Sequence, residues 1–228
     1  MDYFRLRGIG VSPGIAIGDV LLTEKVIFTA RKDSISPDQI EEEIKRLKKA
    51  VERTHEQLTL LRKEIREKIG KEHSFIFDAH LLILGDSSLI RGLEKRIHED
   101  KSSAEWAISR VHDKYMALFE SIPDEYFRER KSDVADVLSK LHNNLEPAEL
   151  GKRDDDKEKI LVAHDLLPSE AALRLSRGNI LAVALDMGGG TSHTAILARS
   201  LNIPAVVGLR NISQQIKSGD CLIVDGTD

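Results

Sequence analysis

A run of three glycines, followed by two hydroxyl residues and a histidine, holds the residue types best suited to chemistry. It consists of Gly188, Gly189, Gly190, Thr191, Ser192 and His193. Because glycine has no Cβ atom, such a run can adopt positive φ angles and approach a ligand closely. Thr191 or Ser192 can cap the helix predicted to follow, whose free N–H groups and positive dipole end favour a phosphate group. We therefore predict a phosphate-binding loop that ends in a histidine.

His193 has the position and the protonation state of a nucleophile. A cation is disfavoured at a helix N-terminus, so we expect a neutral imidazole, which is the nucleophilic form. The loop amides and the Thr191 and Ser192 hydroxyls could stabilise a phosphoryl group on the ring. Arg199 lies six residues further on, on another side of the helix, so we expect no direct contact between its guanidinium and the phosphate. The residues alone also allow a plain tight turn beside a surface histidine.

Other site motifs do not fit the sequence. The spacing of a dinucleotide-binding GxGxxG motif and the Lys-Ser/Thr pair of a Walker loop are both missing. Cys221 is the only cysteine, which excludes an internal disulfide and a CxxC metal site, and its apolar neighbours predict a buried thiol. The remaining histidines show no i, i+4 arrangement typical of a metal site, so we predict none.

The composition narrows the class of protein. The 228 residues are 41% hydrophobic and 32% charged, with a formal net charge of −4. Because the two signs of charge are interspersed, the basic footprint of a nucleic-acid binder is missing. No apolar run approaches the roughly 18 residues of a membrane helix, and the N-terminus does not resemble a signal peptide. We expect a soluble cytoplasmic chain that binds neither nucleic acid nor membrane.

The elements that position the loop are of two kinds. The stretch from Gly8 to Gly18 is β-branched and rich in glycine, which predicts short strands. A capping box and a proline at the first helical position, residues 36–39, then predict a helix start. A long helix over 40–69 and further helical patterns up to residue 145 predict an antiparallel bundle of about four helices.

After a polar linker over 146–157, the pattern becomes α/β. Strands are predicted over 159–163, 180–185, 205–207 and 222–224, and helices over 168–176 and 192–200. The N-terminal strands alone could not bury their apolar faces. We therefore predict an α/β plus all-α fold, in which an antiparallel helical bundle, residues 31–145, is inserted into an α/β subdomain made of 1–30 and 146–228.

The glycine loop and its surroundings resemble the phosphohistidine signature of phosphoenolpyruvate-utilising enzymes. The resemblance runs from Gly188 to Arg199 and continues from Ile203 to Gly208. The opening from Val11 to Gly18 and the stretch from Asp165 to Glu170 are similar to the N-terminal half of Enzyme I of the bacterial phosphotransferase system. The related dikinase and synthase carry a nucleotide-binding domain before their histidine, and no segment here fits one.

The resemblance implies a phosphotransferase of sugar uptake. In the Enzyme I family the histidine matching His193 takes a phosphoryl group from phosphoenolpyruvate and passes it to a histidine of the phosphocarrier HPr, while its α/β subdomain swivels. The donor site, with Mg²⁺, lies in a C-terminal barrel that we expect this chain to lack. We therefore expect a monomeric N-terminal domain of a dimeric enzyme, with no cofactor of its own. The loop-supporting residues would be Gly188, Gly189, Gly190, Thr191, Ser192 and Arg199.

In that family the inserted helices dock HPr. Residues 75–84 carry more apolar side chains than one buried stripe needs, which leaves a docking face and core packing both open. The candidate contact residues are Phe77, Asp78, His80, Leu81, Leu82 and Asp86.

Two positions depart from the family pattern. Enzyme I members commonly have Thr where this chain has Leu167, and often Arg where it has Gly190. The resemblance implies that the Thr hydroxyl hydrogen-bonds the active histidine, so without it we expect another group to orient the ring of His193. His164 is one candidate, and a purely structural His164 is the alternative. A nitrogen-related Enzyme I, another phosphoenolpyruvate-utilising enzyme and an interaction module without chemistry are the alternative functions.

Overall fold

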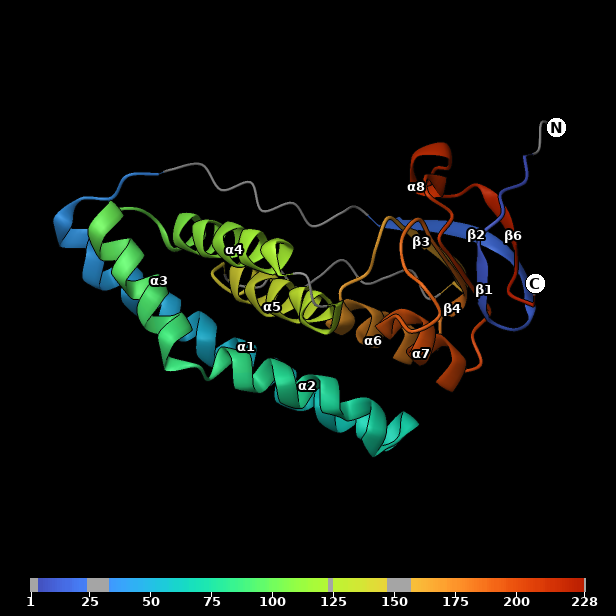
Figure 1. The fold of residues 1–228 in the computed structure, drawn as a ribbon, viewed down its shortest axis with the longest axis horizontal. Coiled ribbons are helices and arrows are strands. Elements are labelled where there is room, and N and C mark those ends of the chain that lie inside the picture. The colour runs from blue at the N-terminus through green and yellow to red at the C-terminus, as the bar shows by residue number, and fades with distance from the viewer. Residues whose placement is uncertain (1–3, 24–32, 123–124, 147–156, 228) are drawn as a thin grey trace. The chain divides into compact units, whose positions relative to one another are not determined.

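A computed structural model describes residues 4–23, 33–122, 125–146 and 157–227, with only the backbone described for 125–129. Two compact units share the chain (Figure 1). The sheet unit comprises Met1–Lys25, Glu67–His73 and Lys152–Asp228, and the helical unit comprises Val26–Arg66 and Ser74–Gly151. The predicted linker at 146–157 lies almost entirely outside the described residues.

One mixed sheet of six strands forms the sheet unit, in the order β1-β5-β4-β3-β2-β6. The strands are β1 (Ile9–Ser12), β2 (Ile15–Thr23), β3 (Lys159–Ala163), β4 (Ile180–Leu185), β5 (Ala205–Val207) and β6 (Cys221–Asp225). Strands β5, β4, β3 and β2 run parallel, and β1 and β6 pair antiparallel at the two edges. The strands predicted at 159–163, 180–185 and 205–207 are confirmed with these bounds.

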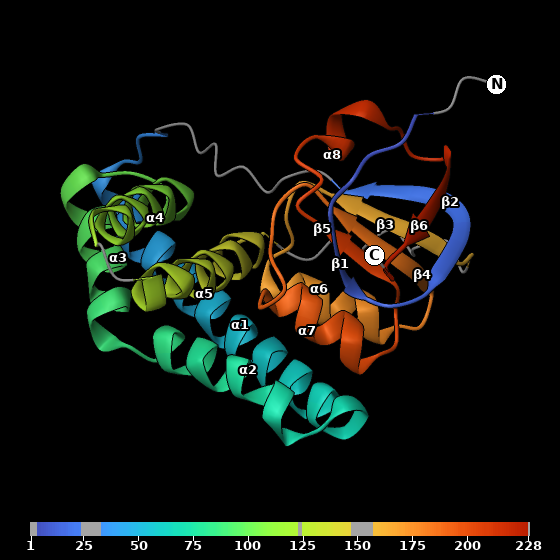
Figure 2. The same cartoon turned by 45° about the vertical axis from the view of Figure 1, so that its right-hand side comes forward.

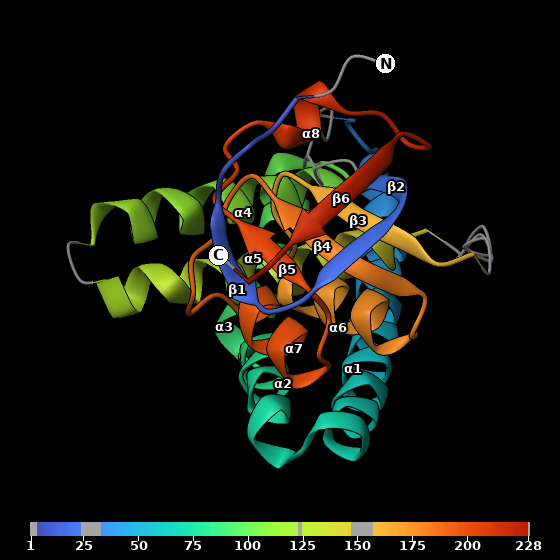
Figure 3. The same cartoon turned by 90° about the vertical axis from the view of Figure 1, so that its right-hand side faces the viewer.

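Helices cover both faces of this sheet. Helices α6 (Pro168–Ser176) and α7 (His193–Ser200) lie on one side and α8 (Ile212–Gln215) on the other (Figures 2 and 3). Ile160 and Val162 of β3 pack with Ile212 of α8, and the alternate residue Leu161 is equally buried. A strand covered on both faces has a continuous apolar sequence, which is why periodicity identified β3 as a short apolar run. The one-turn helix α8 was not predicted.

The prediction of a buried Cys221 is wrong, because the side chain is exposed. Cys221 opens the edge strand β6, whose side chains alternate between the two faces. That alternation buries Val224 and places Cys221 and Ile223 on the outward face, with Ile223 64% exposed. An apolar sequence on an edge strand thus does not imply burial on both sides.

Five α-helices lie wholly or mostly in the helical unit among the described residues, one more than predicted. They are α1 (Ile40–Ile69), α2 (Lys71–Leu84), α3 (Ser87–Asp100), α4 (Ala104–Ser121) and α5 (Glu125–Asn143). The predicted capping box is confirmed: Gln39 Oε1 accepts from the backbone N–H of Ser36 at 2.9 Å, and one 3₁₀ turn (Pro37–Gln39) leads into α1. The five helices lie between β2 and β3 in the chain, although these two strands are direct neighbours in the sheet.

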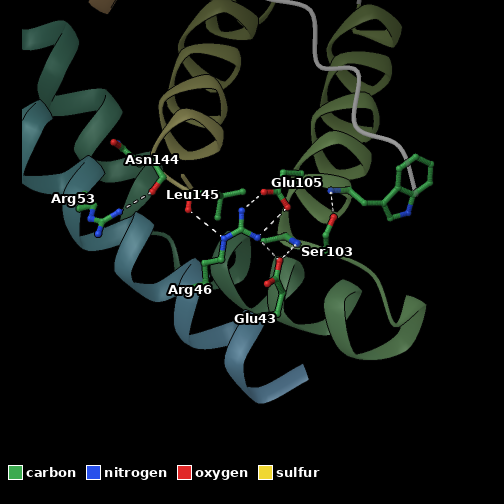
Figure 4. Close-up of polar contacts among 9 residues, drawn as sticks. Glu43, Arg46, Arg53, Ser103, Glu105, Asn144 and Leu145 are labelled. Atoms are coloured by element: carbon green, nitrogen blue, oxygen red, sulfur yellow. Dashed lines mark hydrogen bonds and ion pairs between the residues drawn. The ribbon is translucent and has the colours of Figure 1, made fainter. Parts of the chain in front are cut away.

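Ion pairs and hydrogen bonds of Arg46 join α1 to α4 and to the chain just beyond α5 (Figure 4). Arg46 of α1 pairs with Glu105 of α4 and with Glu43, and its Nε donates to the carbonyl of Leu145 just beyond α5 at 3.2 Å. Burial raises the pKa of Glu105, but the hydrogen bond and charge of Arg46 outweigh it and hold that pKa below its ordinary value. Arg53 donates to the carbonyl of Asn144 at 3.4 Å. Two arginines of α1 thus satisfy carbonyls that the end of α5 leaves unpaired.

Candidate functional site

The glycine loop leaves the sheet at the carboxyl ends of its parallel strands. It joins the end of β4 at Leu185 to the start of α7 at His193. We call its first two residues, Asp186 and Met187, the foot of the loop. Met187 is hydrogen-bonded to both neighbouring strand ends: its N–H donates to the His164 carbonyl beyond β3 at 3.0 Å, and its carbonyl accepts from the Gly208 N–H beyond β5 at 3.4 Å. The carboxyl edge is where open parallel sheets bind ligands, so the loop occupies the expected place for a site.

Of the three glycines, only Gly188 has a backbone conformation that requires glycine. Its φ angle is +104°, in the region that disfavours residues with a side chain. Gly189 and Gly190 have no positive φ, and a Cβ atom on either would meet no atom within 4 Å. The prediction that glycine frees the backbone is confirmed for Gly188, while position 190 has open space for a longer side chain.

Ser192 caps helix α7 and fixes where His193 lies. Its Oγ accepts from the backbone N–H of Ala195 at 3.3 Å, and its own N–H donates to the Gly189 carbonyl at 3.0 Å. His193 is therefore the first residue of α7, and its side chain is half-buried, whereas Thr191 is exposed. The prediction that Thr191 or Ser192 caps the helix is confirmed for Ser192.

Arg199 braces the loop from the far end of the same helix. Its Nη2 donates to the Gly190 carbonyl at 2.6 Å. Because α7 is only two turns long, a side chain from its last turn can reach back to the loop that precedes its first turn. The guanidinium contacts loop backbone in this way, which is compatible with the expectation that it makes no direct phosphate contact.

A buried carboxylate at the foot of the loop was not predicted from the sequence. Asp186 follows β4, and its side chain is fully buried. It accepts hydrogen bonds from the backbone N–H of Ser213 at 3.1 Å, from the Ser213 hydroxyl, and from Nδ1 of His164 at 3.1 Å. The only sequence signal was an acidic residue between an apolar strand and a glycine run, which alone does not distinguish a buried carboxylate from a solvated one.

Leu167, one of the two departures from the family pattern, stands at a helix start. It is the N-cap residue of α6, with φ −67° and ψ 147°, and its side chain makes no capping hydrogen bond. A Thr at this position could accept from a backbone N–H of the first turn. A Thr hydroxyl at position 167 would therefore be placed to cap α6.

The predicted docking residues divide into buried and exposed ones. Phe77 and His80 of α2 are fully buried, so neither side chain offers surface to a partner in this structure. Nε2 of His80 lies 3.1 Å from Oδ2 of Asp136 on α5, in a buried ion pair. The buried stripe of α2 passes through positions 77, 80 and 84, and the sequence alone did not show which side of the helix faces inward.

The other candidates lie at the surface of α2 and of the turn that follows it. Leu82 is 76% exposed, Leu81 is half-buried, and Asp78 pairs with Arg62 of α1 at 2.8 Å. Asp86 caps α3 by accepting from the Ser88 N–H at 2.7 Å. Asp78, Leu81 and Leu82 are thus the candidates with free side-chain surface on α2.

No helix among the described residues is long and apolar enough to cross a membrane. Within the same residues, no group of three or more His, Cys, Asp or Glu side chains is arranged to hold a metal ion.

Curated proteins resemble this chain over nearly its whole length. The curated relatives include phosphoenolpyruvate-protein phosphotransferases of Latilactobacillus sakei, 40% identical over 97% of this chain, and Bacillus subtilis, 37% identical over 97% of it. The chain spans 38% of the length of each of these relatives.

Solved structures show the same fold. A solution structure of Enzyme I matches 97% of this chain with 40% identity and a TM-score of 0.73, and the match covers 90% of that structure. The N-terminal domain of a nitrogen-type Enzyme I also matches, with 26% identity and a TM-score of 0.67. These matches confirm a fold made of helices and a mixed sheet, as predicted at that coarse level.

Two family models divide the chain between them. The model described as PEP-utilising enzyme, N-terminal, matches residues 7–130, and the model described as PEP-utilising enzyme, mobile domain, matches residues 155–228 and so contains the glycine loop and His193. The chain belongs to the family of phosphoenolpyruvate-utilising enzymes.

Proposed function

We propose that this chain is the phosphoryl-carrying part of a phosphoenolpyruvate-protein phosphotransferase and that His193 carries the phosphoryl group. The observation that supports this most is the place of His193: it is the first residue of α7, directly after a glycine loop, at the carboxyl edge of a parallel sheet. The mobile-domain family model covers this region, and the curated relatives carry the name of that activity.

The proposed chemistry is phosphoryl transfer through a phosphohistidine. Nε2 of a neutral His193 attacks phosphorus, so an N–P bond forms while the bond from phosphorus to the donor atom breaks. When the donor is phosphoenolpyruvate, the leaving group is its enolate oxygen; when it is a phosphohistidine of a partner, the leaving group is a ring nitrogen. The protein's contribution is to position the ring and to stabilise charge on the phosphoryl oxygens. The N–H groups in the first turn of α7 and the Thr191 hydroxyl would supply that charge stabilisation.

The two units would divide the work. In this proposal the sheet unit is the swivelling carrier subdomain, and the inserted helical unit docks the phosphocarrier HPr through the exposed face of α2. Asp78, Leu81, Leu82 and Asp86, which are not buried, remain the docking candidates. Phosphoenolpyruvate and Mg²⁺ would bind in the part of the full-length enzyme that lies outside the 38% spanned here.

Labelling by a phosphorylated partner tests the carrier role. Wild-type chain and the His193→Ala variant are incubated with ³²P-labelled phospho-HPr and separated on a gel at alkaline pH, where phosphohistidine survives. We expect label on the wild type and none on the variant. Phosphoenolpyruvate with Mg²⁺ but without any other protein should not label the chain. An unlabelled wild type with several HPr homologues would reject the proposal in favour of an interaction module.

A nitrogen-type system is the second candidate, because the N-terminal domain of a nitrogen-type Enzyme I shares this fold. The higher identity to the other Enzyme I structure, 40% against 26%, favours the sugar-type assignment. Parallel labelling with sugar-type and nitrogen-type HPr at equal concentration distinguishes the two. We expect the sugar-type carrier to donate faster.

A further inference from the structure

His164 makes two contacts with the foot of the glycine loop, one through its ring and one through its backbone carbonyl. Its Nδ1 lies 3.1 Å from Oδ2 of Asp186, and its carbonyl accepts from the Met187 N–H at 3.0 Å. Asp186 and Met187 are the two residues that directly precede Gly188, where the chain turns through a positive φ angle. His164 thus contacts both the side chain of Asp186 and the backbone of Met187.

The chemistry of the two groups fixes which nitrogen carries the proton. An ionised carboxylate only accepts hydrogen bonds, so the contact with Asp186 requires a proton on Nδ1 of His164. A neutral ring then has its lone pair on Nε2. The contact is not a nucleophile-activating triad, because the Ser213 hydroxyl binds the carboxylate and not the imidazole.

Asp186 needs these donors because it is buried. Its side chain has no exposed surface, whereas that of His164 is 34% exposed. A buried carboxylate is costly unless its oxygens are hydrogen-bonded, and the described donors are His164 and two groups of Ser213. Removal of the His164 ring would leave Oδ2 with the Ser213 hydroxyl alone, while the backbone bond between Met187 and the residue at position 164 would remain.

We infer that His164 is a positioning residue for phosphoryl transfer: through Asp186 it holds the loop that places His193 against the phosphoryl group. This inference rests on the proposed carrier role of His193. Since docking of HPr is assigned to the helical unit, His164 should affect the rate of transfer in the docked complex and leave HPr affinity unchanged.

A rescue experiment with two substitutions tests this role. Single-turnover transfer from phospho-HPr is measured at saturation for wild type, His164→Ala, His164→Asn and, as a matched control, His55→Ala on an exposed part of α1. The Asn side chain places an N–H close to where Nδ1–H lies. We expect His164→Ala to slow transfer about tenfold, since small displacements of reacting groups cost that much or more. His164→Asn should stay within about threefold of wild type, and His55→Ala should equal it.

Two further readouts separate positioning from general damage. The dissociation constant for HPr should be the same for all four proteins, and amide hydrogen exchange over residues 187–192 should speed up in His164→Ala and recover in His164→Asn. Equal transfer rates for wild type and His164→Ala, or an Asn variant as slow as the Ala variant, would overturn the inference and leave the carrier role intact. If the wild type takes no label, the carrier role of His193 is rejected. Independently of that result, amide exchange over residues 187–192 that is unchanged in His164→Ala would overturn the positioning role of His164.

Discussion

Removal of one charge from the buried pair between His80 and Asp136 should destabilise the helical unit strongly. The two side chains are 0% and 1% exposed, and Nδ1 of His80 also contacts the carbonyl of Ile76. Because a carbonyl and a carboxylate both only accept, the two contacts are satisfied together only by a doubly protonated ring. Loss of one partner from a buried ion pair costs about 3–5 kcal/mol. We expect Asp136→Asn to cost about 3 kcal/mol, at the lower end because the amide oxygen still accepts.

The loss of stability in Asp136→Asn should become smaller as the pH rises, because it depends on the protonation of His80. Burial lowers the pKa of His80, but the hydrogen bond and charge of Asp136, the Ile76 carbonyl and the charge of Asp133 outweigh it, so the pKa lies above its ordinary value. The unfolded-state pKa is about 6.5. A raised folded-state pKa means that the stabilisation is fully present below about pH 6.5 and is lost as pH rises through the folded-state pKa. The stability gap between wild type and Asp136→Asn should therefore be largest near pH 6 and narrow toward pH 9.

Urea unfolding followed by far-ultraviolet circular dichroism measures this gap. Asp78→Asn is the matched control: it removes a carboxylate from an ion pair with Arg62 in which both side chains are about 40% exposed. Exposed pairs contribute less than about 1 kcal/mol, so this variant should stay close to wild type at every pH. A cost for Asp136→Asn no larger than that of Asp78→Asn at pH 6, or a gap that does not change between pH 6 and pH 9, would refute the reasoning.

Two further predictions concern backbone and capping in the sheet unit. Gly188→Ala should lower the free energy of unfolding by about 1–2 kcal/mol, because it forces a residue with a side chain into a φ of +104°. Gly190→Ala should change it by less than about 0.5 kcal/mol in thermal unfolding, because position 190 has neither a positive φ nor a close neighbour. Equal effects of the two substitutions would contradict this argument. Leu167→Thr should be about 1 kcal/mol more stable than the isosteric Leu167→Val in denaturant unfolding, because only Thr supplies a capping oxygen to α6. Equal stability of the two variants would show that a hydroxyl at position 167 does not cap α6.

Local signals in the sequence were sufficient for most of the elements. The capping box at Ser36 marked the entry to α1, and Pro168 marked the start of α6, because a cap or a proline acts on its own turn of chain. The central strands stood out as apolar runs because both of their faces are buried. The same local rules allowed either Thr191 or Ser192 as the cap of α7, and the structure has Ser192 there.

Features that depend on pairs of residues distant in sequence were out of reach. His164 and Asp186 are 22 residues apart, and their contact exists because β3 and β4 are parallel neighbours. The burial of His80 depends on Asp136 of α5, so the amphipathic pattern of α2 alone could not show which side faces inward. Local propensity describes one segment at a time, whereas these contacts are tertiary.

We propose above all that His193 is the residue of this chain that carries the phosphoryl group. The most direct test is to phosphorylate the ¹⁵N-histidine-labelled chain with phospho-HPr and to identify the modified nitrogen by ¹⁵N–³¹P NMR correlation. We predict a single phosphoramidate signal at Nε2 of His193, which disappears in His193→Ala. A phosphoryl group on another residue, or a signal that persists in that variant, would contradict the account.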